Sequence, residues 1–189
     1  MAKEVERPQL LAAVEGFRQR EGGRPLLVAI DGRGGAGKSG LAEWLQRHLP
    51  HAVVVHVDDF GRPDIAYDDW DWDRLREQVL EPMQAGRRTR YQVFDWNRDV
   101  LGIWQELQPV GIVIVEGVSI LRHELGDPWD VRVWVEAPFK LRLERGVARD
   151  GEPMRSTWLD GWMPQEDEYV AKQDPLKRAD FIVRGDSGE

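Results

Sequence analysis

Short apolar runs alternate along the chain with segments whose apolar positions recur every three or four residues. The runs are typical of buried parallel strands, and the recurring positions give each intervening segment one apolar helical face. Strands are expected at 26–30, 52–57, 110–115, 131–135 and 181–183. Helices are expected at 8–20, from 38 onward, and at 72–85, 100–107, 138–149 and 156–172. This alternation predicts an α/β fold, a central parallel β-sheet flanked by helices.

Prolines and irregular stretches modify this pattern. Pro82 and Pro164 should end or kink their helices, because proline lacks a backbone N–H. Residues 62–73 are acidic and aromatic and are expected to form a loop, whereas residues 87–96 predict a short hairpin or an irregular strand. The chain has no internal repeat and no obvious linker, so residues 1–189 are expected to form a single domain with a lid at about 142–165.

Composition narrows the classes of function. The formal net charge of −8 argues against nucleic acid as the main partner, because phosphate backbones are bound by Lys and Arg. The chain has no cysteine, which excludes disulfides, thiolate metal sites and a thiol nucleophile. Its charged beginning and the lack of a long apolar run predict no signal peptide and no membrane span, and therefore a cytoplasmic protein.

A glycine-rich segment, DGRGGAGKS, joins the first predicted strand to the helix that follows. It fits the pattern G-x-x-x-x-G-K-[ST], in which backbone N–H groups and a helix N-terminus surround phosphate oxygens. Lys38 would lie between the β- and γ-phosphates, and the Ser39 hydroxyl would bind Mg²⁺. The expected phosphate cradle is Gly32, Arg33, Gly34, Gly35, Ala36, Gly37, Lys38, Ser39 and Gly40. The alternative is a glycine-rich turn that binds nothing.

Two more predicted strands end in acidic residues, and the carboxyl ends of parallel strands share one edge of a sheet. Asp58 is expected to accept the proton of an acceptor hydroxyl and to lie near Mg²⁺, with Asp59 as the less favoured base or metal-water ligand. Glu116 is expected to contact Mg²⁺ or its water shell. The alternatives are carboxylates that cap a turn, or a solvated strand end.

Further polar residues offer weaker signals. Arg142, Arg145 and Arg149 share one helical face and could stabilise a transferring phosphoryl group, unless they form a solvated face paired with nearby glutamates. The acidic run that contains Asp69 lies among aromatic residues and could hold the hydroxyls of a sugar-like acceptor, or could be a solvated loop. Several tryptophans lie in polar surroundings, where they could line a cleft or cover a small core.

In this order the motifs resemble the uridine kinase family of phosphate-loop kinases, with its pantothenate kinase and phosphoribulokinase relatives. The resemblance runs from residue 26 to about residue 185. It rests on the phosphate loop, D-x-F at 58–60, a strand ending in Glu116-Gly117, RLERGVARD at 142–150 and A-D-x-I-V at 179–183. It implies a three-layer P-loop NTPase fold with Asp58 as the base, Glu116 assisting Mg²⁺, and Arg145 and Arg149 in a helical lid over the phosphates.

The departures from this family concern the acceptor. Uridine kinases usually have Tyr where this chain has Gly61, and a histidine after the Y-D-F stretch where this chain has Asn97. The phosphate-donor half therefore matches better than the half that reads the base. Candidate acceptor contacts are Asp58, Phe60, Asp69, Tyr91, Phe94, Trp96 and Arg142.

The sequence thus predicts a kinase that uses ATP and Mg²⁺ to phosphorylate a hydroxyl of a small, nucleoside-like acceptor. The choice of ATP over GTP rests on the resemblance. Neither nucleic acid nor a membrane is an expected partner, and a homo-oligomer stays open. One alternative is a nucleotide monophosphate kinase that would use the arginines at 87, 88, 90 and 98; others are a partner-coupled regulatory NTPase and a binding module without catalysis.

Overall fold

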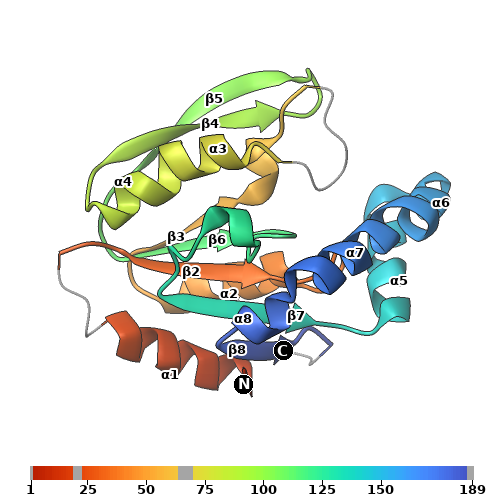
Figure 1. Cartoon of the computed structure of the whole chain (residues 1–189), viewed down its shortest axis with the longest axis horizontal. Coiled ribbons are helices and arrows are strands. Elements are labelled where there is room, and N and C mark those ends of the chain that lie inside the picture. Colours follow the sequence, from red (N-terminus) through yellow and green to blue (C-terminus); the bar gives the residue numbers. More distant parts are fainter. Residues whose placement is uncertain (1, 19–22, 64–69, 187–189) are drawn as a thin grey trace.

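A computed structural model describes residues 2–18, 23–63 and 70–186 of the chain. Within these residues the main sheet has six parallel strands (Figure 1). Their order is β1 (Lys3–Glu4), β8 (Phe181–Arg184), β7 (Val131–Glu136), β2 (Leu26–Asp31), β6 (Ile112–Glu116) and β3 (Ala52–His56). Every residue of β2 and β6 is buried, as continuous apolar runs in a parallel sheet predict. The five strands expected from the sequence are confirmed.

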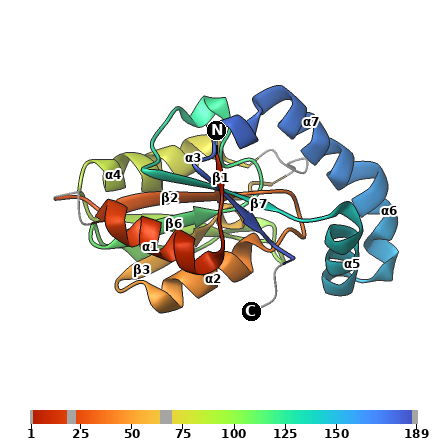
Figure 2. The ribbon, with the colours of Figure 1, turned by 90° about the horizontal axis from the view of Figure 1, so that it is seen from below.

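Helices cover both faces of this sheet (Figure 2). On one face, α1 (Arg7–Arg18) and α2 (Lys38–His48) pack their leucines and valines against the sheet. On the other face lie α3 (Trp72–Leu75), α4 (Glu81–Gln84), α7 (Met163–Gln173) and α8 (Pro175–Arg178). The predicted three-layer α/β architecture is therefore confirmed.

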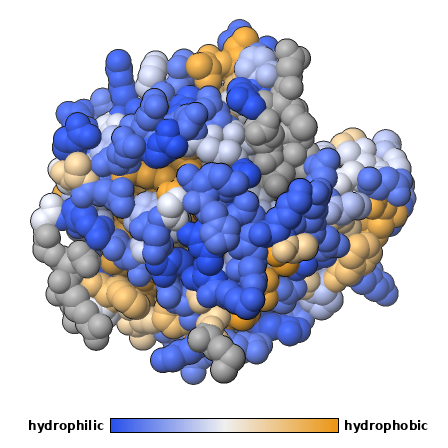
Figure 3. Space-filling model, in the orientation of Figure 1, coloured by the Kyte–Doolittle hydropathy of each residue, from blue (hydrophilic) through white to orange (hydrophobic). Residues whose placement is uncertain are grey.

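A second, two-stranded sheet corrects one prediction. Residues 100–107, expected to be a helix, form β5 (Val100–Leu107), which pairs antiparallel with β4 (Thr89–Asp95). Val100 and Ile103 are β-branched and Gly102 lies between them, and such residues favour an extended chain over a helix. The apolar side chains of β5 are largely exposed, and hydrophobic surface gathers at the upper edge of the face in Figure 3, where Figure 1 shows this hairpin.

Pro82 and Pro164 each follow a π-helical turn. Arg76–Leu80 forms one such turn between α3 and α4, ahead of Pro82. Trp158–Trp162 forms the other between α6 (Arg155–Thr157) and α7, ahead of Pro164. The wider turn relieves the clash between the proline ring and the preceding turn, so each helix continues through its proline with a local change of winding.

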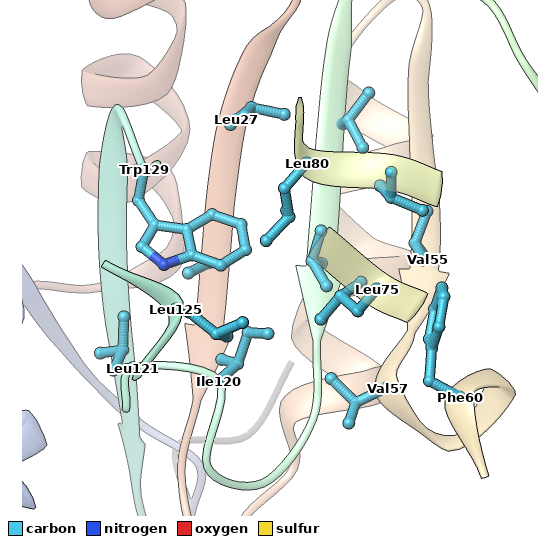
Figure 4. Close-up of a cluster of buried hydrophobic side chains, with 14 of the residues drawn as sticks. Leu27, Val55, Val57, Phe60, Leu75, Leu80, Ile120, Leu121, Leu125 and Trp129 are labelled. Atoms are coloured by element: carbon cyan, nitrogen blue, oxygen red, sulfur yellow. The ribbon is translucent and has the colours of Figure 1, made fainter. Parts of the chain in front are cut away.

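The larger buried cluster lies on the side of α3 and α4 (Figure 4). Leu27 of β2 and Val55 of β3 face Leu75 and Leu80 from the helical layer, and Trp129 closes one end. Each such side chain contributes roughly 1.5–3 kcal/mol through its removal from water. This packing fixes the strands whose carboxyl ends carry the polar residues.

Helix α5 (Phe139–Asp150) and α6 stand at one end of the sheet (Figures 1 and 2). Trp158 and Met163 pack against Val147 of α5 and give this region its own small apolar cluster. The described part of the chain contains no helix of the length and apolarity needed to cross a membrane.

Candidate active site

Three neighbouring strands deliver polar residues to one edge of the sheet. In the register of the sheet, Ile30 of β2 and His56 of β3 both lie opposite Glu116 of β6. The phosphate loop follows β2 directly, and Asp58 follows β3 in a short 3₁₀ turn. The predicted convergence of these strand ends is therefore confirmed.

The glycine-rich loop has the backbone that its sequence demands. Gly35 and Gly37 have φ values of 73° and 103°, which favour glycine. At Gly34 a side chain would begin 2.6 Å from the Glu166 carboxylate, so the packing leaves no room for one. Helix α2 begins at Lys38, and the Lys38 ammonium donates to the Arg33 carbonyl at 3.1 Å, which folds the lysine across the loop.

A cavity of about 820 Å³ opens above this loop, a volume typical of small-ligand sites. Its walls include Gly34, Gly35, Gly37, Lys38, Ser39, Gly40, Asp58, Glu116, Arg145 and Arg149. The tryptophans that line it are Trp70, Trp96, Trp158 and Trp162. The sequence could not distinguish tryptophans that line a cleft from tryptophans that cover a core, and the structure places these four at the cleft. Asp69 lies outside the described residues.

Glu116 and Ser39 form the candidate magnesium position. The Ser39 hydroxyl donates to Glu116 Oε1 at 3.0 Å, and His56 Nδ1 lies 2.6 Å from the same oxygen. Burial favours a higher pKa for Glu116, but the bonds from His56 and Ser39 and the charge of Lys38 outweigh it and lower the pKa. The carboxylate is therefore ionised at neutral pH.

Asp58 lines the same cavity as the loop. Part of the Asp58 surface is exposed to solvent. The surrounding protein nevertheless desolvates the carboxylate, and this desolvation, together with the nearby charge of Glu116, raises the pKa of Asp58. The neighbouring Asp59 accepts a hydrogen bond from the Tyr91 hydroxyl at 3.2 Å and is not a cavity-lining residue. The geometry thus favours Asp58 over Asp59 as the base.

The aromatic candidates for acceptor binding divide into two groups. Phe60, Tyr91 and Phe94 are buried and are not among the cavity-lining residues, so the structure does not support them as acceptor contacts. Trp96 is 52% exposed, lines the cavity, and donates its indole N–H to the Asp58 carbonyl at 2.9 Å. The Trp96 ring also meets Phe94 and Trp70 edge to face. Trp96 is therefore the member of this set best placed to touch an acceptor.

The three arginines of α5 do not act alike. Arg145 and Arg149 line the cavity, and Arg145 donates to the Gly185 carbonyl at 3.0 Å. Arg142 is only 4% exposed and pairs with the buried carboxylate of Glu166 at 3.2 Å. Arg142 therefore braces the phosphate loop through Glu166 and is not among the cavity-lining residues, so the structure does not support it as an acceptor contact. Its burial follows from the fold of the α7 region, which helical spacing alone does not reveal.

Two further carboxylates hold the site together, and the sequence did not single them out. Asp31, fully buried, accepts the N–H groups of Gly32, Ser119 and Leu121 and the Tyr169 hydroxyl. Glu166 accepts the Gly34 N–H at 2.8 Å. A carboxylate directly after a buried strand was the only available signal for Asp31; Glu166 lies in a helix with several exposed acids, which conceal it.

Among known proteins, the chain is similar in sequence to uridine kinases. A scan of protein families finds no match. Uridine-cytidine kinase C of Dictyostelium discoideum is 24% identical over 148 residues; the match takes in 73% of this chain but only a third of that protein's length. The uridine kinase of Staphylococcus aureus is 25% identical over 182 residues, which cover 83% of this chain and 86% of that enzyme.

The fold agrees with these relatives. The structure described as a possible uridine kinase from Bacillus stearothermophilus superposes with a TM-score of 0.65 and covers 93% of this chain and 99% of the other, at 19% identity. At that identity the match establishes the α/β P-loop NTPase fold. In sequence the chain is thus similar to uridine kinases, and its loop and fold are those of the P-loop NTPases.

Proposed function

We propose that the protein uses ATP and Mg²⁺ to transfer the γ-phosphoryl group to a hydroxyl of a small acceptor. One observation carries this proposal: Asp58 lies on the wall of the same cavity that the phosphate loop and Lys38 border. A carboxylate in that place can accept the proton of a hydroxyl that attacks the γ-phosphorus. Its raised pKa brings its basicity nearer to the operating pH.

The oxygen donors at the loop suit Mg²⁺. Ser39 supplies a hydroxyl and Glu116 a carboxylate, and both are hard ligands of the kind that Mg²⁺ prefers. In the described ranges no three acidic, histidine or cysteine residues gather as a chelating group, which fits a cation held mainly by nucleotide phosphates and water. When bound, Mg²⁺ would neutralise charge on the phosphates. Asp58 is near enough to Glu116 for their charges to interact, so Asp58 could contact the water shell of the cation.

Of the remaining cavity residues, some would bind the phosphates of the nucleotide and others the acceptor molecule. The N–H groups of the loop and Lys38 hold the phosphates, while Arg145 and Arg149 approach from the lid and compensate charge on the transferred group. Closure of the lid would keep water from replacing the acceptor. Trp96 and Trp70 offer flat, partly apolar surfaces beside Asp58, which suit the ring of a nucleoside-like acceptor.

The structure offers less support for a nucleotide monophosphate kinase. Arg88 pairs with Glu106, and Arg90 lies over the Trp104 ring, near the start of β4 and the end of β5. That end of the hairpin is opposite to Trp96. Arg98 lies at the Trp96 end, and none of the four arginines, 87, 88, 90 and 98, is among the cavity-lining residues. The hydroxyl acceptor is therefore the better proposal.

The first test is acceptor-dependent ADP release from Mg-ATP with nucleosides, nucleotides, sugars and vitamins. With the active acceptor, Asp58→Asn should lose at least a hundredfold in kcat, as removal of a general base does, while nucleotide binding stays within about twofold. Asp59→Asn is the matched control and should retain most activity. Asp58→Asn with wild-type turnover would refute the base, and hydrolysis that no acceptor alters would favour a regulatory NTPase.

Lys38→Ala tests the donor half separately. Loss of the ammonium should abolish turnover and weaken ATP binding, because Lys38 is the cationic residue of the first turn of α2, next to the phosphates. Calorimetric titration with ATP measures the second effect directly. Unchanged activity in this variant would rule out the phosphate-loop mechanism.

A further inference from the structure

We propose that His56 is a positioning residue that orients Glu116, and through it the Ser39 hydroxyl, for the cation at the phosphate loop. This inference rests on the proposed function, because it assigns a role within the magnesium position of that site. His56 belongs to none of the motifs discussed for the sequence. It is the last residue of β3, two positions before Asp58.

The parallel register brings His56 to Glu116. The two residues lie opposite each other at the carboxyl ends of β3 and β6, so their side chains leave the sheet at the same level. His56 Nδ1 lies 2.6 Å from Glu116 Oε1. An ionised carboxylate can only accept a hydrogen bond, so Nδ1 must carry the hydrogen.

Ser39 approaches the same carboxylate oxygen from the first turn of α2, at 3.0 Å. Glu116 Oε1 thus receives one hydrogen from the imidazole and one from the hydroxyl. With its hydrogen directed at Oε1, the Ser39 oxygen can turn its lone pairs toward a cation in the loop. The second carboxylate oxygen of Glu116 is held in a fixed orientation for the cation or for its water.

The position of His56 argues for support of Glu116 rather than for direct catalysis. Glu116 is 5% exposed, whereas the His56 side chain is 44% exposed, so the imidazole contributes little to the core. The cavity-lining residues include Glu116, Ser39 and Asp58 but not His56. Partners behind a metal ligand fix its orientation, and their loss typically weakens metal binding by about 10- to 100-fold.

The test compares His56→Leu, which removes the donor, with His56→Asn, whose amide N–H can take the place of Nδ1–H. Mn²⁺ binding is followed by electron paramagnetic resonance in the presence of a non-hydrolysable ATP analogue. We expect half-saturation of His56→Leu at a Mn²⁺ concentration at least tenfold higher than in the wild type. His56→Asn should recover to within about threefold, and the KM for the acceptor should stay unchanged. His48→Leu, at the far end of α2, is the matched control.

Nitrogen-15 NMR of the metal-free protein gives a second readout, and its wild-type spectrum does not depend on any variant folding. The His56 signals should show a hydrogen on Nδ1, and Glu116→Gln should change the Nδ1 shift. An Nδ1 without hydrogen, or wild-type Mn²⁺ affinity in His56→Leu, would overturn the proposal. So would failure of His56→Asn to bind Mn²⁺ better than His56→Leu. Normal Mn²⁺ binding without phosphoryl transfer to any acceptor would instead refute the proposed function.

Discussion

At the scale of single residues, Gly61 shows how a missing side chain shapes the acceptor wall. A Cβ at this position would lie 2.6 Å from Phe94 and 2.6 Å from the Trp96 ring, so both rings pack directly on the Gly61 backbone. Uridine kinases usually carry Tyr here. The indole of Trp96 therefore lies where a side chain at position 61 would begin.

Gly61→Ala should push the Trp96 ring out of position, since an aromatic ring cannot yield as a flexible side chain can. We expect a several-fold increase in the KM for the acceptor, with ATP affinity unchanged. Gly16→Ala is the control: nothing lies within 4 Å of a Cβ there, and alanine should stabilise α1 by up to about 1 kcal/mol. An unchanged acceptor KM in Gly61→Ala would show that Trp96 does not define the acceptor wall.

Asp58 also makes a prediction about pH. The carboxylate must be ionised to accept a proton, and burial followed by the charge of Glu116 raises its pKa above the ordinary value of 3.8. The value of kcat/KM should therefore rise with pH along an acid limb whose midpoint lies above 3.8. Asp59→Asn should keep this limb. Activity that stays constant down to pH 3.8 would contradict the assignment of Asp58.

The sequence could locate individual site residues only where spacing or strand ends reveal them. Lys38 and Ser39 follow from the loop pattern, and Asp58 and Glu116 from their places after buried strands. His56 and Arg142 could not be assigned in this way, because the role of each depends on a partner far away in the chain. His56 meets Glu116 through the sheet register, and Arg142 meets Glu166 through the fold of the lid region.

At the scale of elements, the buried pair of Arg142 and Glu166 connects α5 and α7 to the phosphate loop. Glu166 accepts hydrogen bonds from Arg142 and from the Gly34 N–H. Glu166 is only 2% exposed, and Arg142→Leu would put an apolar side chain in place of the cation beside its carboxylate. Breaking such a pair typically costs about 3–5 kcal/mol.

We therefore expect Arg142→Leu to lower the free energy of unfolding by about that amount in urea denaturation. Asp167→Asn removes the neighbouring pair with Arg33, in which the aspartate side chain is 59% exposed. This control should lose no more than about 1 kcal/mol. Equal losses in the two variants would show that Arg142 does not compensate the Glu166 charge.

At the scale of elements, the sequence predicted one element wrongly and two others incompletely, for physical reasons. A short helix is the sequence prediction for residues 100–107, but these residues form the edge strand β5, which pairs with β4 and carries apolar side chains on both of its faces. Pro82 and Pro164 correctly predicted a disturbance of their helices. The π-helical turns ahead of these prolines depend on details of backbone geometry that hydrophobic periodicity does not contain.

At the scale of the whole molecule, the alternation of strands and helices was enough to predict the layers but not the order of the strands. Apolar runs show that β2 and β6 are buried, and they do not say that β2 lies between β6 and β7. That order places the phosphate loop beside Glu116, whose strand begins at Ile112. The site is thus assembled from segments whose proximity only the completed sheet provides.

This order has a consequence for how the protein is made. The central strand β2 pairs with β6 from Leu26 and Ile112 onward, and with β7 from Val28 and Val131 onward. A ribosome would therefore have to release most of the chain before the strand that carries the phosphate loop could find either neighbour. Until then, both edges of an apolar strand are open to wrong pairings, and the loop has no sheet to hold it in shape. A ligand of this loop could stabilise the nascent protein only late in its synthesis.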